Sequence, residues 1–318
     1  MFAARGIAVS CSVFFLVYVI LSLGVGYLTR HIVGRLHETA PRRLADLLFA
    51  LRMFPLTAAA LITAAFTVPS FLLLEPRAIV EPVGGAMLAL GICGLLLAAL
   101  GAANAVRALL RASRMVERWT YGAKLLPSQA AVSVLVIPDT APALTAAGIV
   151  RSKVLLSGAA QAALDANELQ IALRHEEAHV RRRDNFKKLL LRIVAFPGMA
   201  GLEISWVEAT EMAADDAAVC SVCEALDLAS ALIKLSQIDA KPERHSEELM
   251  TAFAQSSSAL INARVQRLVS WGDHRLKSTQ RYSVWYAGGA ALAIATAFCA
   301  TYSHLLAQVH TATEWLVK

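Results

Sequence analysis

The sequence predicts a mainly α-helical membrane protein with four transmembrane helices and a cytoplasmic α+β domain inserted between the third and the fourth. Hydrophobic residues make up 57% of the 318 residues and charged residues only 17%. The mean hydropathy of +0.55 is too high for an ordinary soluble protein. Four stretches contain no Asp, Glu, Lys or Arg, and between the last two of them strand-like and helix-like segments follow one another.

The four apolar stretches predict the transmembrane helices. A bilayer core requires about 20 consecutive apolar residues, and the stretches of that length are Ile7–Leu28, Met53–Leu74, Val83–Val106 and Val284–Leu306. The first stretch follows Arg5 as a signal peptide would, but it is long and lacks a clear cleavage site, so we expect it to remain as an anchor. The chain then divides into residues 1–110 with three transmembrane helices, residues 111–281 as one domain, and residues 282–318 with the fourth helix and a short extracytoplasmic tail.

The basic residues predict the orientation in the membrane. Residues 29–52 carry five arginines and residues 75–82 carry one, whereas residues 107–281 hold 22 of the 30 basic residues. Because Lys and Arg concentrate on the cytoplasmic side, we expect the inserted domain in the cytoplasm and both termini outside. The net charge of +6 does not indicate nucleic-acid binding, because the basic residues lie beside the spans, where anionic lipid of the bilayer is the nearer partner.

The inserted domain begins with predicted strands and continues with helices. Ala131–Pro138 and Ile149–Ser157 are rich in Val, Ile and Leu, which predicts two strands. Asp165, followed three residues later by Glu168, predicts a capping box at the start of a long helix. Pro and Gly in Ala195–Trp206 predict a break before the next helix.

The later part of the domain is predicted to connect the helices to the last span. Ser236–Leu249 is polar and indicates a linker, and Ala259–Trp271 has the pattern of an amphipathic helix. We expect Asn262–Val269, between the domain and the last span, to be exposed and a candidate for self-cleavage. We also expect Ala143–Ser157 to offer a strand edge to which an extended peptide substrate can add.

The predicted long helix contains the sequence HEEAH, from His175 to His179. Residues four apart lie on the same helix face, so both histidines can bind one metal ion with Glu176 beside it. In this H-E-x-x-H arrangement two imidazoles hold zinc (Zn²⁺), and the glutamate accepts a proton from water whose pKa the metal lowers from 15.7 to about 7. The alternative is the polar face of an ordinary helix.

A catalytic zinc site needs a third protein ligand. The alanine-rich segment Glu208–Val219 predicts a second helix, in which Glu211 and Asp215 are again four residues apart. One carboxylate can bind the metal while the other accepts the free ring N–H of a ligand histidine. Glu211 is the preferred ligand, and Glu208 and Asp216 are rivals at a shifted register.

These motifs resemble the membrane-embedded zinc metalloproteases of the BlaR/MecR antirepressor type. The resemblance covers three spans, the strand pattern, ELQIALRHEEAHVRRRDN, EMAADDAAV and a fourth span. It implies a multi-pass endopeptidase of the bacterial inner membrane, with His175, His179 and Glu211 as zinc ligands, Glu176 as general base and Asp215 as the partner of a ligand histidine. By the same resemblance, the protein substrate would be a cytoplasmic repressor, the protease itself or another membrane-associated protein.

The sequence departs from the antibiotic sensors of this family after the fourth span. Those sensors continue into a large extracellular penicillin-binding domain, whereas about a dozen residues follow the last span here, so we expect no β-lactam binding through such a domain. Two alternatives remain open. One is a quality-control or processing protease resembling the HtpX or CAAX-prenyl-protease group, although three spans before the domain favour the antirepressor type. The other is a non-catalytic signalling scaffold.

Overall fold

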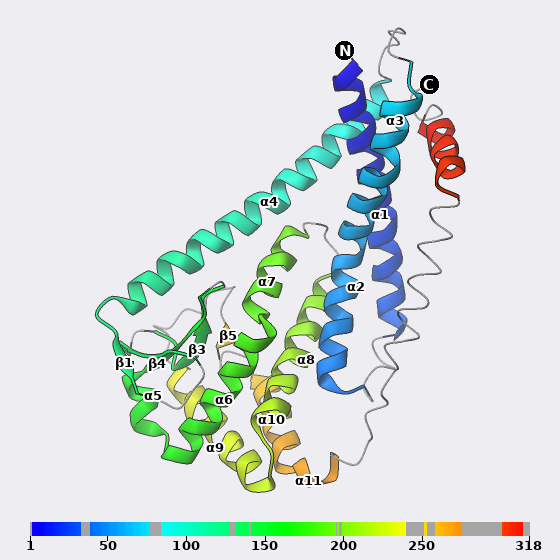
Figure 1. The fold of residues 1–318 in the computed structure, drawn as a ribbon. Coiled ribbons are helices and arrows are strands. Elements are labelled where there is room, and N and C mark those ends of the chain that lie inside the picture. Colours follow the sequence, from blue (N-terminus) through cyan, green and yellow to red (C-terminus); the bar gives the residue numbers. More distant parts are fainter. Residues whose placement is uncertain are drawn as a thin grey trace.

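The computed structural model describes residues 2–32, 39–76, 84–127, 132–139, 141–149, 151–194, 196, 199–239, 251–252, 258–274 and 301–313. A group of long helices forms one end of an elongated molecule, and shorter helices with a small sheet form the other (Figure 1). The structure is mostly helical and combines three segments apolar enough to cross a membrane with a small sheet, which agrees with this part of the prediction.

Three long apolar helical segments form the membrane part. They are α1 (Phe2–Ile32), the run formed by α2 (Pro41–Ile62), η2 (Thr63–Thr67) and α3 (Val68–Leu74), and α4 (Gly85–Thr120). Each contains a stretch long and apolar enough to cross a membrane, so the first three predicted spans all lie in such helices. α2 begins well before Met53 and α4 ends well after Val106, because hydropathy marks only the lipid-facing part of a helix that continues beyond the hydrocarbon.

Small residues allow α1 and α4 to pack closely. A Cβ atom at Gly94 would lie 2.4 Å from the carbonyl oxygen of Cys11, so only glycine permits this approach. Next to this contact, the Ser12 hydroxyl donates to the carbonyl of Met87 at 2.7 Å. Close backbone approach with an interhelical hydrogen bond is a common way to join helices in lipid.

The predicted fourth span, Val284–Leu306, lies mostly outside the described residues. Its last residues belong to a helix over 301–313. In this helix the Tyr302 hydroxyl donates at 2.7 Å to the carbonyl of Ala65, which lies in the π-helical segment η2. His310 lies 3.9 Å from Glu75, which pairs with Arg5 at 2.9 Å. Helix 301–313 therefore lies at the same end of the molecule as the N-terminus.

The described residues of the domain include a five-stranded sheet. Its strands are β1 (Lys124–Leu126), β2 (Val134–Ile137), β3 (Leu144–Ala147), β4 (Lys153–Ser157) and β5 (Thr251–Ala252). The order is β1-β2-β4-β3-β5, with β2 and β4 parallel and the other pairs antiparallel. β2 and β4 lie within the two predicted strands. The predicted edge segment Ala143–Ser157 is divided into β3 and β4 near Gly148, whose φ of +92° favours glycine.

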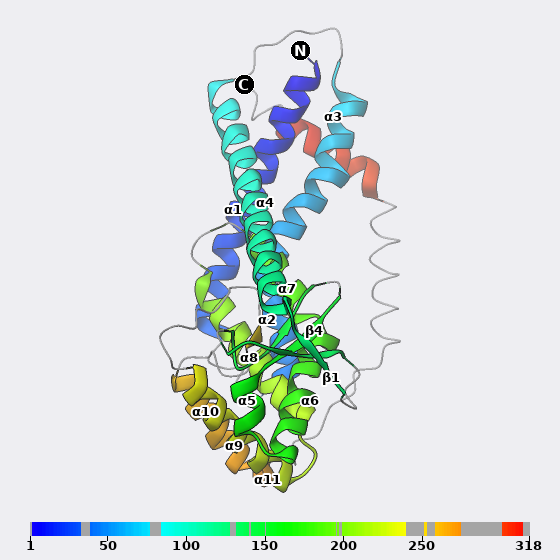
Figure 2. The same cartoon turned by 90° about the vertical axis from the view of Figure 1, so that its left-hand side faces the viewer.

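Helices cover the sheet and form the rest of the domain (Figure 2). They are α5 (Gly158–Ala163), α6 (Ala166–Arg182), α7 (Asp184–Ile193), α8 (Ala200–Ala218), α9 (Val222–Asp239), α10 (Ser258–Val269) and α11 (Trp271–His274). Their main core includes Leu156, Ile171 and Leu232, all nearly inaccessible to solvent. α8 begins at Ala200, so the predicted break is shorter than Ala195–Trp206. In the predicted linker, residues 236–239 end α9, and residues 240–249 lie outside the described residues.

Candidate metal centre

Helix α6 positions the two histidines of the HEEAH sequence. The predicted capping box is present: Asp165 accepts from the backbone N–H of Glu168, and the Glu168 side chain accepts from the N–H of Asp165, both at 2.9 Å. Glu168 also accepts from Ser230 and Lys234 of α9, each at 2.6 Å. Burial raises the pKa of Glu168, but these bonds outweigh it and leave the pKa below its ordinary value. The start of α6 is therefore fixed both by its own cap and by α9.

His175, His179 and Glu211 converge as three metal ligands would. His175 Nε2 lies 3.1 Å from His179 Nε2, and Glu211 of α8 lies 3.6 Å from His175 Nε2 and 3.7 Å from His179 Nε2. Tetrahedral ligands of zinc with bonds of about 2.0–2.1 Å lie about 3.3 Å apart, so these spacings fit one ion. This buried group can hold a metal ion.

Two carboxylates orient the ligand histidines. Asp215 lies 3.0 Å from His175 Nδ1, as predicted, and Asp184 lies 2.8 Å from His179 Nδ1. A carboxylate at Nδ1 favours the tautomer with the proton on that nitrogen, which leaves Nε2 with a lone pair. When both rings are neutral, the two Nε2 lone pairs and the Glu211 carboxylate face one another inside the protein, and either a bound metal ion or a proton on His175 relieves this repulsion.

The electrostatics of the centre favour positive charge. Burial lowers the pKa of His175, but Asp215 and Glu211 outweigh burial and raise it to about 9. Burial raises the pKa of Glu211, whereas His179 and Arg264 lower it more strongly, to about 2. The pKa of Asp215 is likewise held below its ordinary value, mainly by Arg264 acting against burial. Glu211 and Asp215 are therefore ionised at neutral pH.

Arg264 of α10 completes the centre and was not predicted. Its Nε and Nη2 donate to the two oxygens of Asp215 at 2.9 and 2.6 Å, and its Nη1 donates to Glu211 Oε2 at 2.9 Å. Its exposed fraction is 0%. The expectation that Asn262–Val269 is an exposed segment holds only for one face of this helix: Arg264 and Leu268 are buried, whereas Asn262, Ala263, Gln266 and Val269 are exposed. α10 otherwise agrees with the predicted amphipathic helix.

Glu176 is placed between the metal ligands and the sheet. Its Oε2 accepts from the backbone N–H of Ala146 in β3 at 2.6 Å. Its Oε1 is buried and has no hydrogen-bond partner among the residues that the structure describes. Burial raises the pKa of Glu176, and the nearby histidines only partly oppose this effect. A carboxylate with one fixed and one free oxygen and a raised pKa has the properties of a general base.

Strand β3 lies beside the centre. A strand in this position is what the predicted addition of an extended peptide to Ala143–Ser157 needs. The Asn185 amide donates to the carbonyl oxygens of Ala146 and Gly148 at 2.9 and 3.2 Å, so the backbone N–H and C=O of Ala146 are both bonded to side chains beside the centre. The predicted free edge needs correction, however. β4 is internal, and the outer side of β3 pairs with β5, with Thr145 opposite Ala252 and Ala146 opposite Thr251.

Asp184 and Asn185 reach the centre because of one unusual turn. Arg183, between α6 and α7, has a positive φ of 55° and ends α6. Non-glycine residues rarely adopt this left-handed conformation. The turn directs Asp184 back to His179, which a continuous helix would not do for residues five apart. The sequence HVRRRDN contains these residues, but their spacing after His179 gave no indication of a role, because residues five apart on a continuous helix do not share a face.

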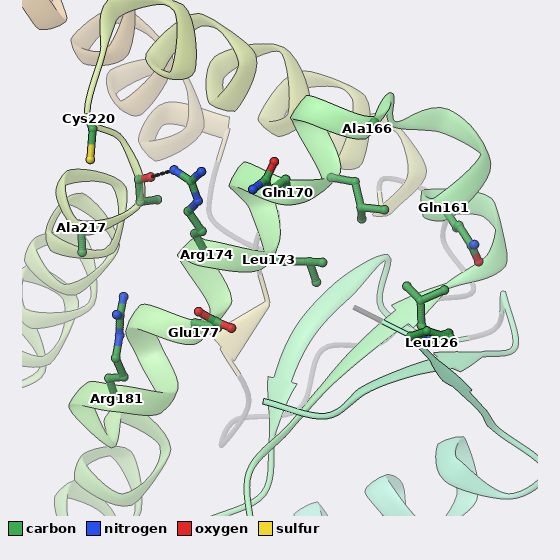
Figure 3. A pocket seen from close by; sticks show the side chains of 13 residues that line it. Leu126, Gln161, Ala166, Gln170, Leu173, Arg174, Glu177, Arg181, Ala217 and Cys220 are labelled. Carbon is green, nitrogen blue, oxygen red and sulfur yellow. Dashed lines mark hydrogen bonds between the residues drawn. The ribbon is translucent and has the colours of Figure 1, made fainter. Parts of the chain in front are cut away.

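The other candidates lie elsewhere. The rival ligand Glu208 is exposed, and Asp216 pairs with Arg267 of α10. A cavity of about 720 Å³ opens on α6 and is lined by residues that include Leu173, Arg174 and Glu177 (Figure 3). With about 3.6 residues per turn, these side chains lie on the helix face opposite His175 and His179. This cavity is therefore not the metal centre, whose ligands are all less than 5% exposed.

No protein-family model matches the chain, and no curated protein matches it. The residues of the centre and the resemblance of the motifs are therefore what point to a function.

Proposed function

We propose that this protein is an integral-membrane, zinc-dependent endopeptidase. The observation that carries the proposal is the free Oε1 of Glu176, which is buried next to three convergent metal ligands. A structural metal site needs no general base, because its ligands close the coordination sphere. A carboxylate beside a three-ligand site is instead the arrangement of zinc-dependent hydrolases.

Zinc is the metal that this donor set fits best. Two imidazole nitrogens and one carboxylate are the protein ligands of one class of catalytic zinc site, with a further position open. When bound, zinc would supply Lewis acidity that polarises the scissile carbonyl and lowers the pKa of the attacking water. Asp184 and Asp215 would keep the ligand histidines in the required tautomer.

Glu176 and β3 would perform the remaining steps. The free oxygen of Glu176 accepts a proton from the attacking water and returns it to the leaving amine. A substrate in extended conformation pairs with the outer edge of β3, next to Ala146, whose own N–H and C=O are already bonded to Glu176 and Asn185. The antiparallel pairing of β5 with β3 supports this binding mode, because a segment of the chain already pairs with this edge. Such a substrate would have to displace β5.

The resemblance to the antirepressor family supports a regulatory role, with the chain itself or a cytoplasmic repressor as the substrate. α4 extends past the apolar stretch and leads directly into the sheet (Figure 1), so the domain would face the cytoplasmic membrane surface if the positive-inside orientation holds. A membrane quality-control protease remains the alternative, and a non-catalytic scaffold is the second. Activity against a co-expressed repressor separates the first two.

The test compares the purified wild type with Glu176→Gln and Glu177→Gln. Glu177 is the matched control, because it is adjacent in sequence but lies on the opposite helix face. We expect one zinc per chain in all three proteins. We expect fragments of the chain or of a co-expressed repressor from the wild type and from Glu177→Gln, with a rate at least about a hundredfold lower for Glu176→Gln.

Two results would contradict the proposal. Absence of zinc from all three proteins would mean that the convergent groups do not select this metal. Equal fragment yields from the wild type and Glu176→Gln would assign the cleavage to another protease, and a cellular phenotype that survived Glu176→Gln would favour the scaffold.

A further inference from the structure

A second polar site lies where the membrane helices meet the domain. A cavity of about 380 Å³ is lined by residues of α2, α4, α7 and α8 and by Val194 and Phe196, which follow α7. Its charged lining residues are Arg52, Arg107, Arg111, Arg192 and Glu203. Four arginines against one glutamate leave this arginine pocket with a net charge of +3 from its lining. It is distinct from the metal centre, none of whose ligands contributes to it.

Arg52 is buried beside this pocket and has donors that no described residue satisfies. Its exposed fraction is 6%, and its Nη2 donates to the carbonyl oxygen of Val194 at 3.1 Å. Its Nε and Nη1 are buried and have no hydrogen-bond partner among the described residues. A buried guanidinium with unused donors is costly unless an acceptor reaches it, so this side chain points to a missing anionic partner.

The other charges of the pocket do not supply that partner. Glu203 pairs with Arg192 at 3.5 Å. Arg107 donates to groups of its own helix, the carbonyl of Ala103 and the side chain of Asn104, both at 3.1 Å. The one carboxylate that lines the pocket is therefore already paired, and the excess positive charge remains.

The position of the pocket along the helices indicates the source of the anion. Arg52 directly precedes the apolar stretch that begins at Met53, and Arg107 directly follows the one that ends at Val106. Both therefore lie where the hydrocarbon ends and lipid head groups begin. Basic pockets between transmembrane helices at this level bind the phosphates of anionic lipids.

We propose that the arginine pocket binds the phosphate group of an anionic phospholipid. Guanidinium groups donate paired, charge-assisted hydrogen bonds that match phosphate geometry, and Arg52 has donors available for this purpose. The cavity volume is in the range of small-ligand sites. A lipid in this position would bridge α2 and α4 of the membrane part to α7 and α8 of the domain.

The experiment measures lipid binding by the full chain in neutral detergent. Native mass spectrometry counts bound phosphatidylglycerol on the wild type, Arg52→Met and Arg118→Met. Arg118 is the matched control because it lies on α4, is exposed, and does not line the pocket. Phosphatidylcholine and inorganic phosphate serve as separate probes. Bound zinc is measured in parallel as a check that each variant is folded. This check does not depend on any protease activity.

We expect the wild type and Arg118→Met each to retain one phosphatidylglycerol. We expect Arg52→Met to bind it at least about tenfold more weakly, as for the loss of a charge-assisted hydrogen bond. Inorganic phosphate should displace the lipid only in large excess. Displacement at equal concentration would overturn the lipid as ligand and leave a site for free phosphate. Equal lipid retention by the wild type and Arg52→Met, or equal retention of phosphatidylcholine, would overturn the site itself.

Discussion

The metal centre and the arginine pocket share two helices but have opposite charge. At the centre, the carboxylates of Asp184, Glu211 and Asp215 lie against two histidines and Arg264. At the pocket, four arginines face Glu203. α7 carries Asp184 at its first residue and Arg192 near its end, and α8 carries Glu203 in its first turn and Glu211 further along. Each site therefore has an excess of the charge that attracts its proposed ligand, a cation at one and an anion at the other.

The two sites also differ in how their buried arginine is satisfied. The guanidinium of Arg264 donates to both Asp215 oxygens and to Glu211, whereas Arg52 donates to one backbone carbonyl. A buried arginine that neutralises buried carboxylates stabilises the folded state. A buried arginine whose donors are satisfied only when a ligand binds does not stabilise the ligand-free fold. The same residue type should therefore respond differently to removal at the two sites.

The largest expected effect is the loss of Arg264. Arg264→Met leaves Glu211 and Asp215 buried without their counter-ion, so we expect a decrease of about 3–5 kcal/mol in the free energy of unfolding of the metal-free protein. Arg267→Met is the control on the same helix; its pair with Asp216 is partly exposed and should contribute about 0–1 kcal/mol. Chemical denaturation in detergent measures both. Equal losses in the two variants would mean that Arg264 does not act as a buried counter-ion.

Removing a carboxylate behind a ligand histidine should weaken the metal centre without abolishing it. We expect Asp184→Asn and Asp215→Asn each to lower zinc affinity by about 10- to 100-fold, because the ligand ring loses its orienting partner. Competition with a chelator of known affinity measures this change. Glu208→Gln, on the same helix as Asp215 but exposed, should leave the affinity unchanged. If Asp184→Asn bound zinc as tightly as the wild type, Asp184 would not be part of the metal centre.

The close contact between α4 and α7 beside the arginine pocket can be tested by substitution of Gly101. A Cβ atom at Gly101 in α4 would lie 2.2 Å from the carbonyl oxygen of Ile193 at the end of α7. Gly101→Ala should therefore force the helices apart and decrease the free energy of unfolding by about 1–3 kcal/mol. Gly85→Ala is the control, because nothing lies within 4 Å of its Cβ position. Thermal unfolding compares them, and equal midpoints would contradict the close approach.

The smallest expected effect completes the comparison. In neutral detergent without anionic lipid, Arg52→Met should change the free energy of unfolding by about 1 kcal/mol or less, because replacing a poorly satisfied buried charge with an apolar side chain is often neutral or stabilising. The same denaturation measurement as for Arg264→Met applies. A loss as large as that of Arg264→Met would assign Arg52 to the fold and not to a ligand.

Local patterns in the sequence were sufficient for the three long apolar helices and for half of the candidate metal centre. Runs of apolar residues predict the long helices, because composition alone decides whether a segment can lie in lipid. The capping box at Asp165 and the spacing of His175 and His179 follow from helix geometry, which acts over a few residues. The same geometry places Glu211 and Asp215 on one face of the second helix.

Only the tertiary structure decided which distant groups complete the two sites. Asp184 reaches His179 through the left-handed turn at Arg183, and Arg264 meets Asp215 across 49 positions in sequence. Arg52, which the sequence placed in a loop before the second span, is buried in a helix and bonded to Val194, 142 positions away. Such pairings depend on how helices pack, and the net balance of desolvation and charge pairing that selects them has no local signature in sequence.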